Sequence, residues 1–272
     1  MSSLTRMFGV LDLLEQRAHP LDADAICTEL GYSRPTGYRY IAELVRAGLL
    51  MRVGGGTYGL GPRIIELDYA IRINDPVLAA ATPVMQDLVA ATGGDATLAA
   101  NYGEHVVTTH HEAGPEELIL SYSRGRPMPL VRGALSKCLL AWMPRMRQQR
   151  IYTVHAKEIK TNGLGGDWPG FRTTLARIRK DGFTVSIGEL DPGLAAIAAP
   201  VRDESGDVLA TVAVVVRVTR YALLDHAQLA ALVMDGARRI EQAMQRPVLK
   251  GKARHAPSKP RRKFAADTSR AR

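Results

Sequence analysis

Eight consecutive residues near the N-terminus carry side chains of the types that read DNA. The segment Ser33-Arg34-Pro35-Thr36-Gly37-Tyr38-Arg39-Tyr40 holds two arginines and hydroxyl groups at positions 36, 38 and 40. Such side chains reach base edges and phosphates when they open a helix that lies in the major groove, and a helix N-terminus also favours a phosphate. The predicted DNA-contacting residues are Ser33, Arg34, Pro35, Thr36, Tyr38, Arg39, Tyr40, Arg52 and Tyr58.

Charge is distributed unevenly around this segment. Residues 33–63 contain five arginines and one acid, whereas residues 8–29 contain five acids and one arginine. A module that is neutral overall but positive on one side matches the electrostatic requirement of a specific DNA-binding surface. The alternative is a three-helix module that binds another protein and leaves these arginines in solvent.

The elements that must position the segment follow from the apolar spacing. Asp22 and Ser33 stand where helix N-caps are expected, and Gly31 and Gly48 stand where helices end. The pattern predicts helices over residues 4–16, 22–31 and 33–48, the last with Ile41, Leu44 and Val45 facing inward, and strands over residues 49–53 and 57–60 around Gly54-Gly55-Gly56. This order of elements is typical of a winged helix-turn-helix.

The rest of the chain predicts a joining helix and then a larger α+β domain with a mainly antiparallel sheet. Predicted helices cover residues 77–92, 134–143, 170–181 and 225–245, and predicted strands cover residues 96–101, 106–111, 118–122, 184–187, 194–201 and 208–218. The predicted domains are residues 1–61, a winged helix-turn-helix; residues 62–75, a linker helix; residues 76–246, the larger domain; and residues 247–272, a disordered basic tail.

The net charge of +9 belongs to the C-terminal end of the chain. Residues 246–272 hold ten Lys or Arg and one acid, so the rest of the chain is neutral. We favour added phosphate contacts as the role of this tail, and a solubilising extension is the alternative. No apolar run reaches the roughly 18 residues that span a bilayer, and residues 1–6 lack the features of a secretory signal. We therefore expect a cytoplasmic protein with no membrane partner.

Motifs spread over residues 4–246 resemble those of the IclR family of transcription regulators. In the first domain the resemblance lies in residues 8–14 (FGVLDLL), 31–36 (GYSRPT), Arg39, Leu44, Gly48 and residues 58–63 (YGLGPR). In the second it lies in Pro129, Leu130, Ala134, Lys137 and residues 139–141, 178–183 (IRKDGF), 188–189 (GE) and 193–201 (GLAAIAAPV). Their order and spacing together are highly specific.

The resemblance implies a C-terminal GAF-like effector-binding domain, a homodimer or homotetramer, and double-stranded DNA with a palindromic operator as partner. Two departures leave the operator sequence unpredicted: Pro35 replaces a usual serine, and Gly37 replaces a usual β-branched apolar residue. The family binds small organic acids, and the corresponding effector-binding positions are Leu120, Met128, Ala134, Leu135, Ser186, Ala196, Ala213 and Val215.

The corresponding cavity is expected to be more apolar than in relatives that bind carboxylates through serines, because Ala213 and Val215 replace those serines. We expect an organic acid, aromatic or similarly large, as the effector. Arg124, Arg126 or Arg132 would supply a fork for its carboxylate. The alternative is that these arginines lie in a subunit interface or in solvent.

Catalysis and metal binding are not expected. Adjacent strand residues point to opposite faces, so His110 and His111 cannot chelate one metal through this pair alone. Cys27 and Cys138 lie in apolar patterns and are predicted to be buried thiols, and thiol catalysis at Cys138 would need a base or a resolving cysteine. No nucleotide-binding glycine pattern or zinc spacing is present. The sequence thus predicts no enzyme activity, no cofactor and no metal.

Overall fold

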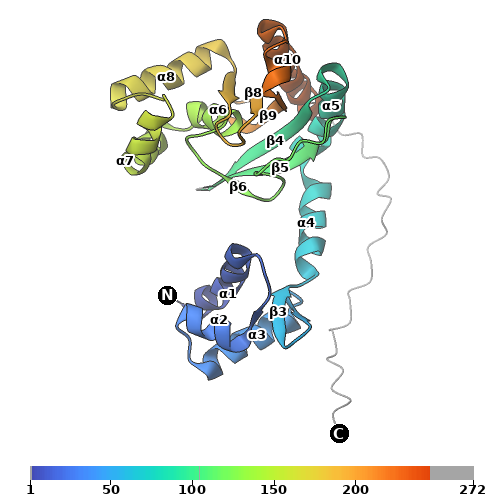
Figure 1. The fold of residues 1–272 in the computed structure, drawn as a ribbon, viewed down its shortest axis with the longest axis vertical. Helices are drawn as coiled ribbons and strands as arrows, with labels where there is room; N and C mark the ends of the chain where they lie inside the picture. Colours follow the sequence, from blue (N-terminus) through green and yellow to red (C-terminus); the bar gives the residue numbers. More distant parts are fainter. Residues whose placement is uncertain (1, 104, 246–272) are drawn as a thin grey trace. The chain divides into compact units, whose positions relative to one another are not determined.

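The computed structural model describes residues 2–103 and 105–245, in two compact units (Figure 1). The described part of the first unit is residues 2–74, and that of the second is residues 75–245. The predicted basic tail at residues 247–272 lies outside the described residues. Among the described helices, none combines the length and the apolar character that a bilayer crossing requires.

The first unit has three helices and a small sheet. Its elements are α1 (Ser3–Arg17), β1 (Leu21–Asp22), α2 (Ala23–Leu30), α3 (Arg34–Arg46), β2 (Leu50–Val53), β3 (Thr57–Leu60) and α4 (Arg63–Asn74). The Asp22 carboxylate accepts a hydrogen bond from the Ala25 N–H at 2.7 Å, and Gly31 ends α2 with φ 63°. Both helix boundaries follow from these residue types, since aspartate caps N–H groups and glycine tolerates the left-handed region.

Strand pairing completes the predicted winged helix-turn-helix, which is confirmed. Strands β2 and β3 pair antiparallel on either side of the glycine turn, and β1 adds to β3 through Leu21 and Tyr58. The two-residue strand β1 was not predicted, because two residues are too short for any alternating pattern.

Two details of α3 differ from the prediction. Ser33 occupies the N-cap position, but its hydroxyl donates to Thr36 Oγ1 at 3.0 Å instead of accepting from the helix backbone. Val45 is exposed, whereas Ile41 and Leu44 are buried. The predicted inward position of Val45 is wrong because it lies about 100° around the helix from Leu44, outside the buried stripe.

A close approach of α2 and α3 explains the glycine at position 37. Gly37 is buried within α3, and a Cβ added there would lie 2.2 Å from Cys27 Sγ and 3.6 Å from Cys27 Cβ. The Cys27 sulfur therefore fills the space that a side chain at position 37 would need. The departure from the family pattern at this position has a packing cause.

Helix α4 matches the predicted linker helix in extent and falls within the first unit. None of its residues is buried, and Ile65, Ile71 and Ile73 are among the most exposed large apolar side chains described. A helix with exposed isoleucines at these positions presents an apolar surface.

The second unit is built on a six-stranded antiparallel sheet in the order β6-β5-β4-β9-β8-β7 (Figure 1). Its elements are α5 (Pro76–Thr92), β4 (Asp95–Tyr102), β5 (His105–Glu112), β6 (Pro127–Met128), α6 (Ala134–Trp142), α7 (Arg145–Thr161), α8 (Trp168–Asp181), β7 (Thr184–Ile187), β8 (Leu194–Arg202), β9 (Val208–Arg217), α9 (Val218–Tyr221) and α10 (His226–Gln245). The predicted α+β architecture is confirmed.

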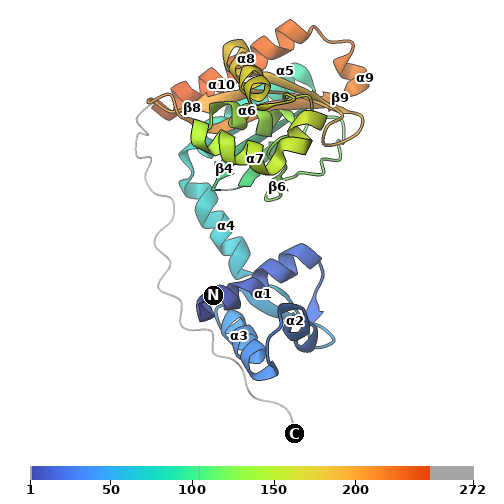
Figure 2. The same cartoon turned by 90° about the vertical axis from the view of Figure 1, so that its left-hand side faces the viewer.

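Helices cover both faces of this sheet. Helices α5 and α10 pack on one face, and α6 packs on the other, with α8 packed against α6 (Figure 2). Alternate residues of the strands supply the two cores: Leu98, Ile197 and Val214 point to the α5–α10 side, whereas Ala99 and Ala198 point to the α6 side. Ala196, on the same side of the sheet as Ala198, lines the space next to the N-terminal end of α6.

Two predictions for this unit are wrong. Residues 118–122 do not form a strand, and the short strand β6 pairs with β5 instead. Their alternation is real, since Leu120 and Tyr122 are half-buried and Ile119 is exposed, but the Ser121 N–H donates to the Asp191 carboxylate instead of to a strand. Helix α7 was missed because its sequence is mainly polar and only Gln148, Ile151 and Ile159 are buried in it.

Candidate functional site

The first turns of α3 present the predicted base-reading side chains on the surface. Ser33, Arg34, Pro35, Tyr38 and Arg39 are exposed, and Thr36 is half-buried. Arg52 is also exposed, on β2. These residues form the α3–wing surface, which is the candidate nucleic-acid interface. Pro35 occupies the first turn of α3, where its missing N–H costs the helix nothing.

Asp24 of α2 contacts two side chains of this surface. Arg34 donates to Asp24 Oδ2 at 2.9 Å, and the two side chains are 75% and 48% exposed. The Tyr38 hydroxyl lies 3.4 Å from the other Asp24 oxygen, and this carboxylate raises the pKa of Tyr38. An ion pair this exposed contributes little to stability, so Arg34 can exchange Asp24 for a phosphate or a base at small cost.

Two of the predicted DNA contacts are wrong. Tyr40 and Tyr58 are buried in the core of the first unit, and the Tyr40 hydroxyl lies 3.0 Å from Ser3 Oγ. Their rings support basic side chains: the guanidinium of Arg39 lies 5.5 Å from the Tyr40 ring centroid, and that of Arg52 lies 5.7 Å from the Tyr58 ring centroid. The two tyrosines therefore orient arginines of the α3–wing surface instead of touching DNA.

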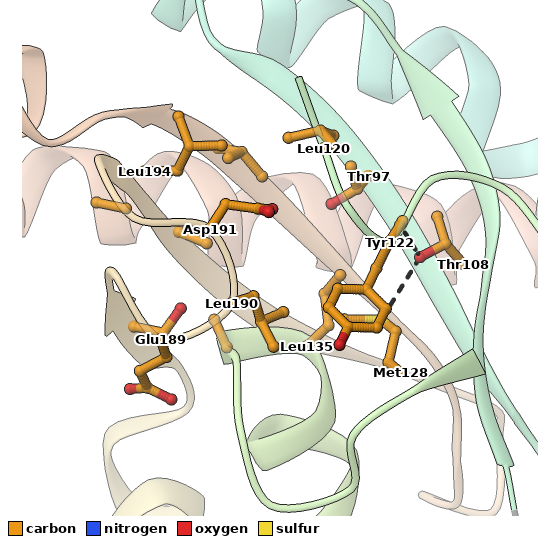
Figure 3. Close-up of a pocket in the computed structure, with 15 residues that line it drawn as sticks. Thr97, Thr108, Leu120, Tyr122, Met128, Leu135, Glu189, Leu190, Asp191 and Leu194 are labelled. Carbon is orange, nitrogen blue, oxygen red and sulfur yellow. Dashed lines mark hydrogen bonds between the residues drawn. The ribbon is translucent and has the colours of Figure 1, made fainter. Parts of the chain in front are cut away.

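A cavity of about 500 Å³, including the part open to solvent, lies between the sheet of the second unit and the start of α6. We call it the α6 cavity. Of the eight effector-binding positions that the family resemblance implied, seven line it: Leu120, Met128, Ala134, Leu135, Ser186, Ala196 and Val215. Figure 3 shows Leu120, Met128 and Leu135 on the walls of the cavity.

The other lining residues were not predicted. They are Thr97, Thr108, Tyr122, Glu189, Leu190, Asp191, Leu194 and Ala195. Glu189, Leu190 and Asp191 belong to the loop between β7 and β8, and the sequence signal that could have indicated them is a pair of acids directly after a buried strand. Thr97 could have been found as the only hydroxyl of an apolar run, Ala96 to Ala100, in β4.

The predicted carboxylate fork is wrong for two of the three arginines and has no support for the third. Arg124 Nη1 donates to the Thr109 carbonyl, and Arg126 Nη1 donates to the Ser121 carbonyl at 2.8 Å. None of Arg124, Arg126 and Arg132 lines the cavity. Ala213 also does not line it, because this residue lies fully buried in the core beneath α6.

An ion pair sits at the N-terminal end of α6. The Glu189 carboxylate accepts from the Gly133 N–H at 2.9 Å and from Lys137 Nζ, which also donates to the Val185 carbonyl at 3.0 Å. The side chains of Lys137 and Glu189 are 9% and 22% exposed. The positive end of α6 and the buried ammonium are thus both matched by a carboxylate of the protein itself.

Both parts of the chain match models of known families. Residues 3–54 match the IclR helix-turn-helix domain, and residues 72–242 match the C-terminal domain of bacterial IclR transcriptional regulators. The chain belongs to the IclR family. Its relatives include the Pca regulon regulatory protein of Pseudomonas putida, 27% identical over 82% of this chain and 78% of the relative, and KdgR of Escherichia coli, 25% identical over 89% of this chain and 92% of the relative.

Solved IclR-family structures share the fold. The Thermotoga maritima IclR superposes with a TM-score of 0.69 at 20% identity, over 89% of this chain and 98% of that one. An IclR homologue from Microbacterium hydrocarbonoxydans, solved in complex with 4-hydroxybenzoate, superposes with a TM-score of 0.73 at 21% identity, over 89% of this chain and 99% of that one. These likenesses extend over both units of the IclR-family fold.

The family and these relatives are transcriptional regulators and not enzymes. Within the described ranges, no group of three or more His, Cys, Asp or Glu side chains is placed to hold a metal ion. His110 contacts Glu112 Oε1 at 2.7 Å and His111 contacts Asp95 Oδ2 at 2.7 Å, so the two imidazoles have separate partners.

Both thiols of this IclR-family chain should be unreactive in the native state. Cys27 and Cys138 are buried, and burial raises the pKa of each thiol, so the nucleophilic thiolate is scarce at neutral pH. We expect Ellman's reagent to label neither cysteine within minutes at pH 7.5, and to label both after denaturation. Rapid labelling of Cys138 in the folded protein would contradict its burial within α6.

Proposed function

We propose that this protein binds a specific, palindromic DNA operator through the α3–wing surface, and that a small organic molecule in the α6 cavity modulates that binding. The proposal rests above all on one observation: the exposed arginines and hydroxyls of α3 lie at the N-terminal end of a recognition helix in a helix-turn-helix unit. Family membership supports it, because the family regulates transcription.

The α3–wing surface supports specific reading more than simple charge attraction. Arg34, Thr36, Tyr38 and Arg39 project from the first turns of α3, where a recognition helix approaches base edges. Arg52 projects from the wing, where a phosphate contact fixes the register of the helix. Residues 8–29 of the same unit hold five acids and one arginine, so the excess of positive charge lies in residues 33–63, which favours binding through this part of the unit.

A homodimer or homotetramer is part of the proposal. A palindromic operator requires two copies of α3 related by two-fold symmetry. The exposed isoleucines of α4 support association, because Ile65, Ile71 and Ile73 gain from burial against another copy.

The α6 cavity is the proposed effector site. Its mainly apolar walls suit an apolar molecule such as an aromatic compound. The homologue solved with 4-hydroxybenzoate supports an aromatic compound as effector, and that compound belongs to the organic acids expected from the sequence. Arg124, Arg126 and Arg132 do not line the cavity, and the first two donate to backbone carbonyls, so other groups are expected to recognise the polar end of the ligand.

Fluorescence anisotropy with the intergenic DNA next to the gene tests the proposed function. We expect wild-type binding to persist in excess competitor DNA, and the Arg34→Ala/Arg39→Ala variant to lose about 100-fold in affinity, at about 1–3 kcal/mol for each arginine. Arg17→Ala is a matched control, because Arg17 pairs with Glu29 of α2 as Arg34 pairs with Asp24. It should bind like the wild type.

The second candidate function is a protein-interaction module that touches DNA only through its tail. Its signature is weak binding that is seen only at low salt and is equal for wild type and the Arg34→Ala/Arg39→Ala variant. That result would contradict the proposed operator binding.

A further inference from the structure

The charged groups that line the α6 cavity are all acidic. Among the described residues that line it, the charged ones are Glu189 and Asp191, and none is Lys or Arg. A ligand carboxylate would therefore enter next to two carboxylates without a basic side chain in the wall. Like charges inside one partly desolvated cavity repel each other more strongly than they do in bulk water.

The positive groups at the N-terminal end of α6 are already occupied. Glu189 takes both the Gly133 N–H at the start of α6 and the ammonium of Lys137. A ligand anion would have to displace Glu189 from Lys137, which would leave a half-buried carboxylate without its partner. The N-terminal end of α6 thus offers less to an acid than its helix dipole alone would suggest.

Asp191 has spare acceptor capacity. Among the described residues, one donor serves its two carboxylate oxygens, the Ser121 N–H, at 3.2 and 3.3 Å. A carboxylate has about four lone-pair sites, so most of its capacity remains for a ligand that donates. No ion pair of Asp191 is found in the described part of the chain.

A buried hydroxyl points to the same space. Thr97 is 3% exposed, and its Oγ1 has no hydrogen-bond partner among the described residues, whereas the neighbouring Thr108 hydroxyl donates to the Tyr122 carbonyl at 2.9 Å. Figure 3 shows the Thr97 oxygen directed into the cavity, toward the carboxylate of Asp191. A buried polar atom without a partner is rare in proteins, and a ligand group between Thr97 and Asp191 would satisfy it.

We propose that the α6 cavity binds a mainly apolar, aromatic-sized ligand whose polar end is a hydrogen-bond donor, a hydroxyl or an ammonium group, held between Asp191 and Thr97, and that it rejects carboxylates there. The ligand donates to the Asp191 carboxylate and accepts from the Thr97 hydroxyl if it is an alcohol. Tyr122, Leu120 and Leu194 enclose its apolar part. This inference rests on the proposed effector role of the cavity and specifies its ligand.

Three probes of similar shape test this ligand class on the full-length protein: 2-phenylethanol, 2-phenylethylamine and phenylacetate. Thermal unfolding and titration calorimetry at equal millimolar concentrations measure the binding of each. We expect the alcohol or the amine to raise the unfolding temperature by about 2 °C or more and to bind about tenfold more tightly than phenylacetate. Tighter binding of the amine than of the alcohol would identify an ammonium group as the polar end of the ligand.

Two variants locate the polar end. Asp191→Asn keeps the side-chain volume and removes the charge. Phenylacetate should therefore bind about tenfold more tightly than to the wild type, and the amine should bind about tenfold more weakly. Thr97→Val removes only the unpartnered hydroxyl and should weaken the alcohol about fivefold. Glu204→Gln is the control, because Glu204 is an exposed acid in the turn between β8 and β9 and its loss should change no affinity.

Equal or tighter binding of phenylacetate, no binding of any probe, or affinities unchanged by Asp191→Asn would each overturn this ligand class. The operator assay with Arg34→Ala/Arg39→Ala tests the proposed function separately. An acid that binds the cavity and alters operator affinity would leave the proposed function standing and remove only the donor preference. An alcohol that binds without changing operator affinity would count against modulation and not against the ligand class.

Discussion

Replacing Gly37 with alanine should destabilise the first unit by about 2 kcal/mol and weaken operator binding at least about tenfold, although alanine is the better helix former. The new Cβ would lie 2.2 Å from Cys27 Sγ, which is far inside the contact distance. Cys27 is itself buried, so its sulfur can move only by changing rotamer or by pushing α2 and α3 apart. A shift of α3 displaces Arg34 and Arg39, which lie on either side of position 37.

Scanning calorimetry of the full chain measures the first effect. For a unit of this size, a loss of about 2 kcal/mol in the free energy of unfolding lowers the unfolding temperature by roughly 8–16 °C. Cys27→Ala should rescue the Gly37→Ala variant, because the Cβ atoms of the two residues would then be 3.6 Å apart, an ordinary contact. Cys27→Ala alone leaves a small cavity and should cost about 1 kcal/mol. A Gly37→Ala variant as stable as the wild type, or no rescue in the double variant, would contradict the packing explanation.

Replacing Glu189 with glutamine should destabilise the second unit by about 3 kcal/mol. The substitution leaves the buried ammonium of Lys137 without a carboxylate, and among the described residues only the Val185 carbonyl then remains as its partner. Glutamine keeps an oxygen that can accept from the Gly133 N–H. The loss of stability therefore measures the removal of the charge and not the loss of the contact with the helix. Lys137→Met should cost less, because Glu189 is the more exposed partner and keeps the Gly133 N–H.

The double variant shows whether Glu189→Gln loses stability because the attraction between the two side chains is gone or because the charge of Lys137 is left uncompensated. Lys137→Met/Glu189→Gln removes both charges and should be more stable than Glu189→Gln alone. For a unit of about 170 residues, 3 kcal/mol corresponds to a fall of roughly 6–12 °C in unfolding temperature. A fall of less than about 2 °C in Glu189→Gln would show that the pair contributes little to stability.

Local chemistry made much of the fold predictable. Asp22 and Gly31 bound α2 because a carboxylate caps N–H groups and a glycine accepts a positive φ, whatever surrounds them. The three glycines between β2 and β3, and the alternation along β8 and β9, act over a few residues and are equally independent of context. The winged helix-turn-helix, the α+β domain and the family resemblance all follow from such signals.

Signals that involve distant partners were misread. Residues 118–122 alternate like a strand, but the Ser121 N–H bonds to a side chain that is 70 residues away. Tyr40 and Tyr58 have the residue type of DNA contacts, but packing turns both rings into the core. The sequence could not tell whether Arg124 and Arg126 face a ligand or backbone carbonyls, because the carbonyls they bind become neighbours only when the chain folds.

The sequence by itself thus determined the order of the elements, the surface of α3 and seven residues of the cavity, since these depend on periodicity, caps and family motifs. Only the tertiary structure decided the chemistry of the cavity. Glu189 neutralises Lys137. Within the part of the chain that the structure describes, Asp191 keeps free acceptor sites and the Thr97 hydroxyl lacks a hydrogen-bond partner, and none of these facts is local. Charge and hydrogen bonding depend on which groups meet in space, and pairs such as Ser121 and Asp191 meet only in the folded domain.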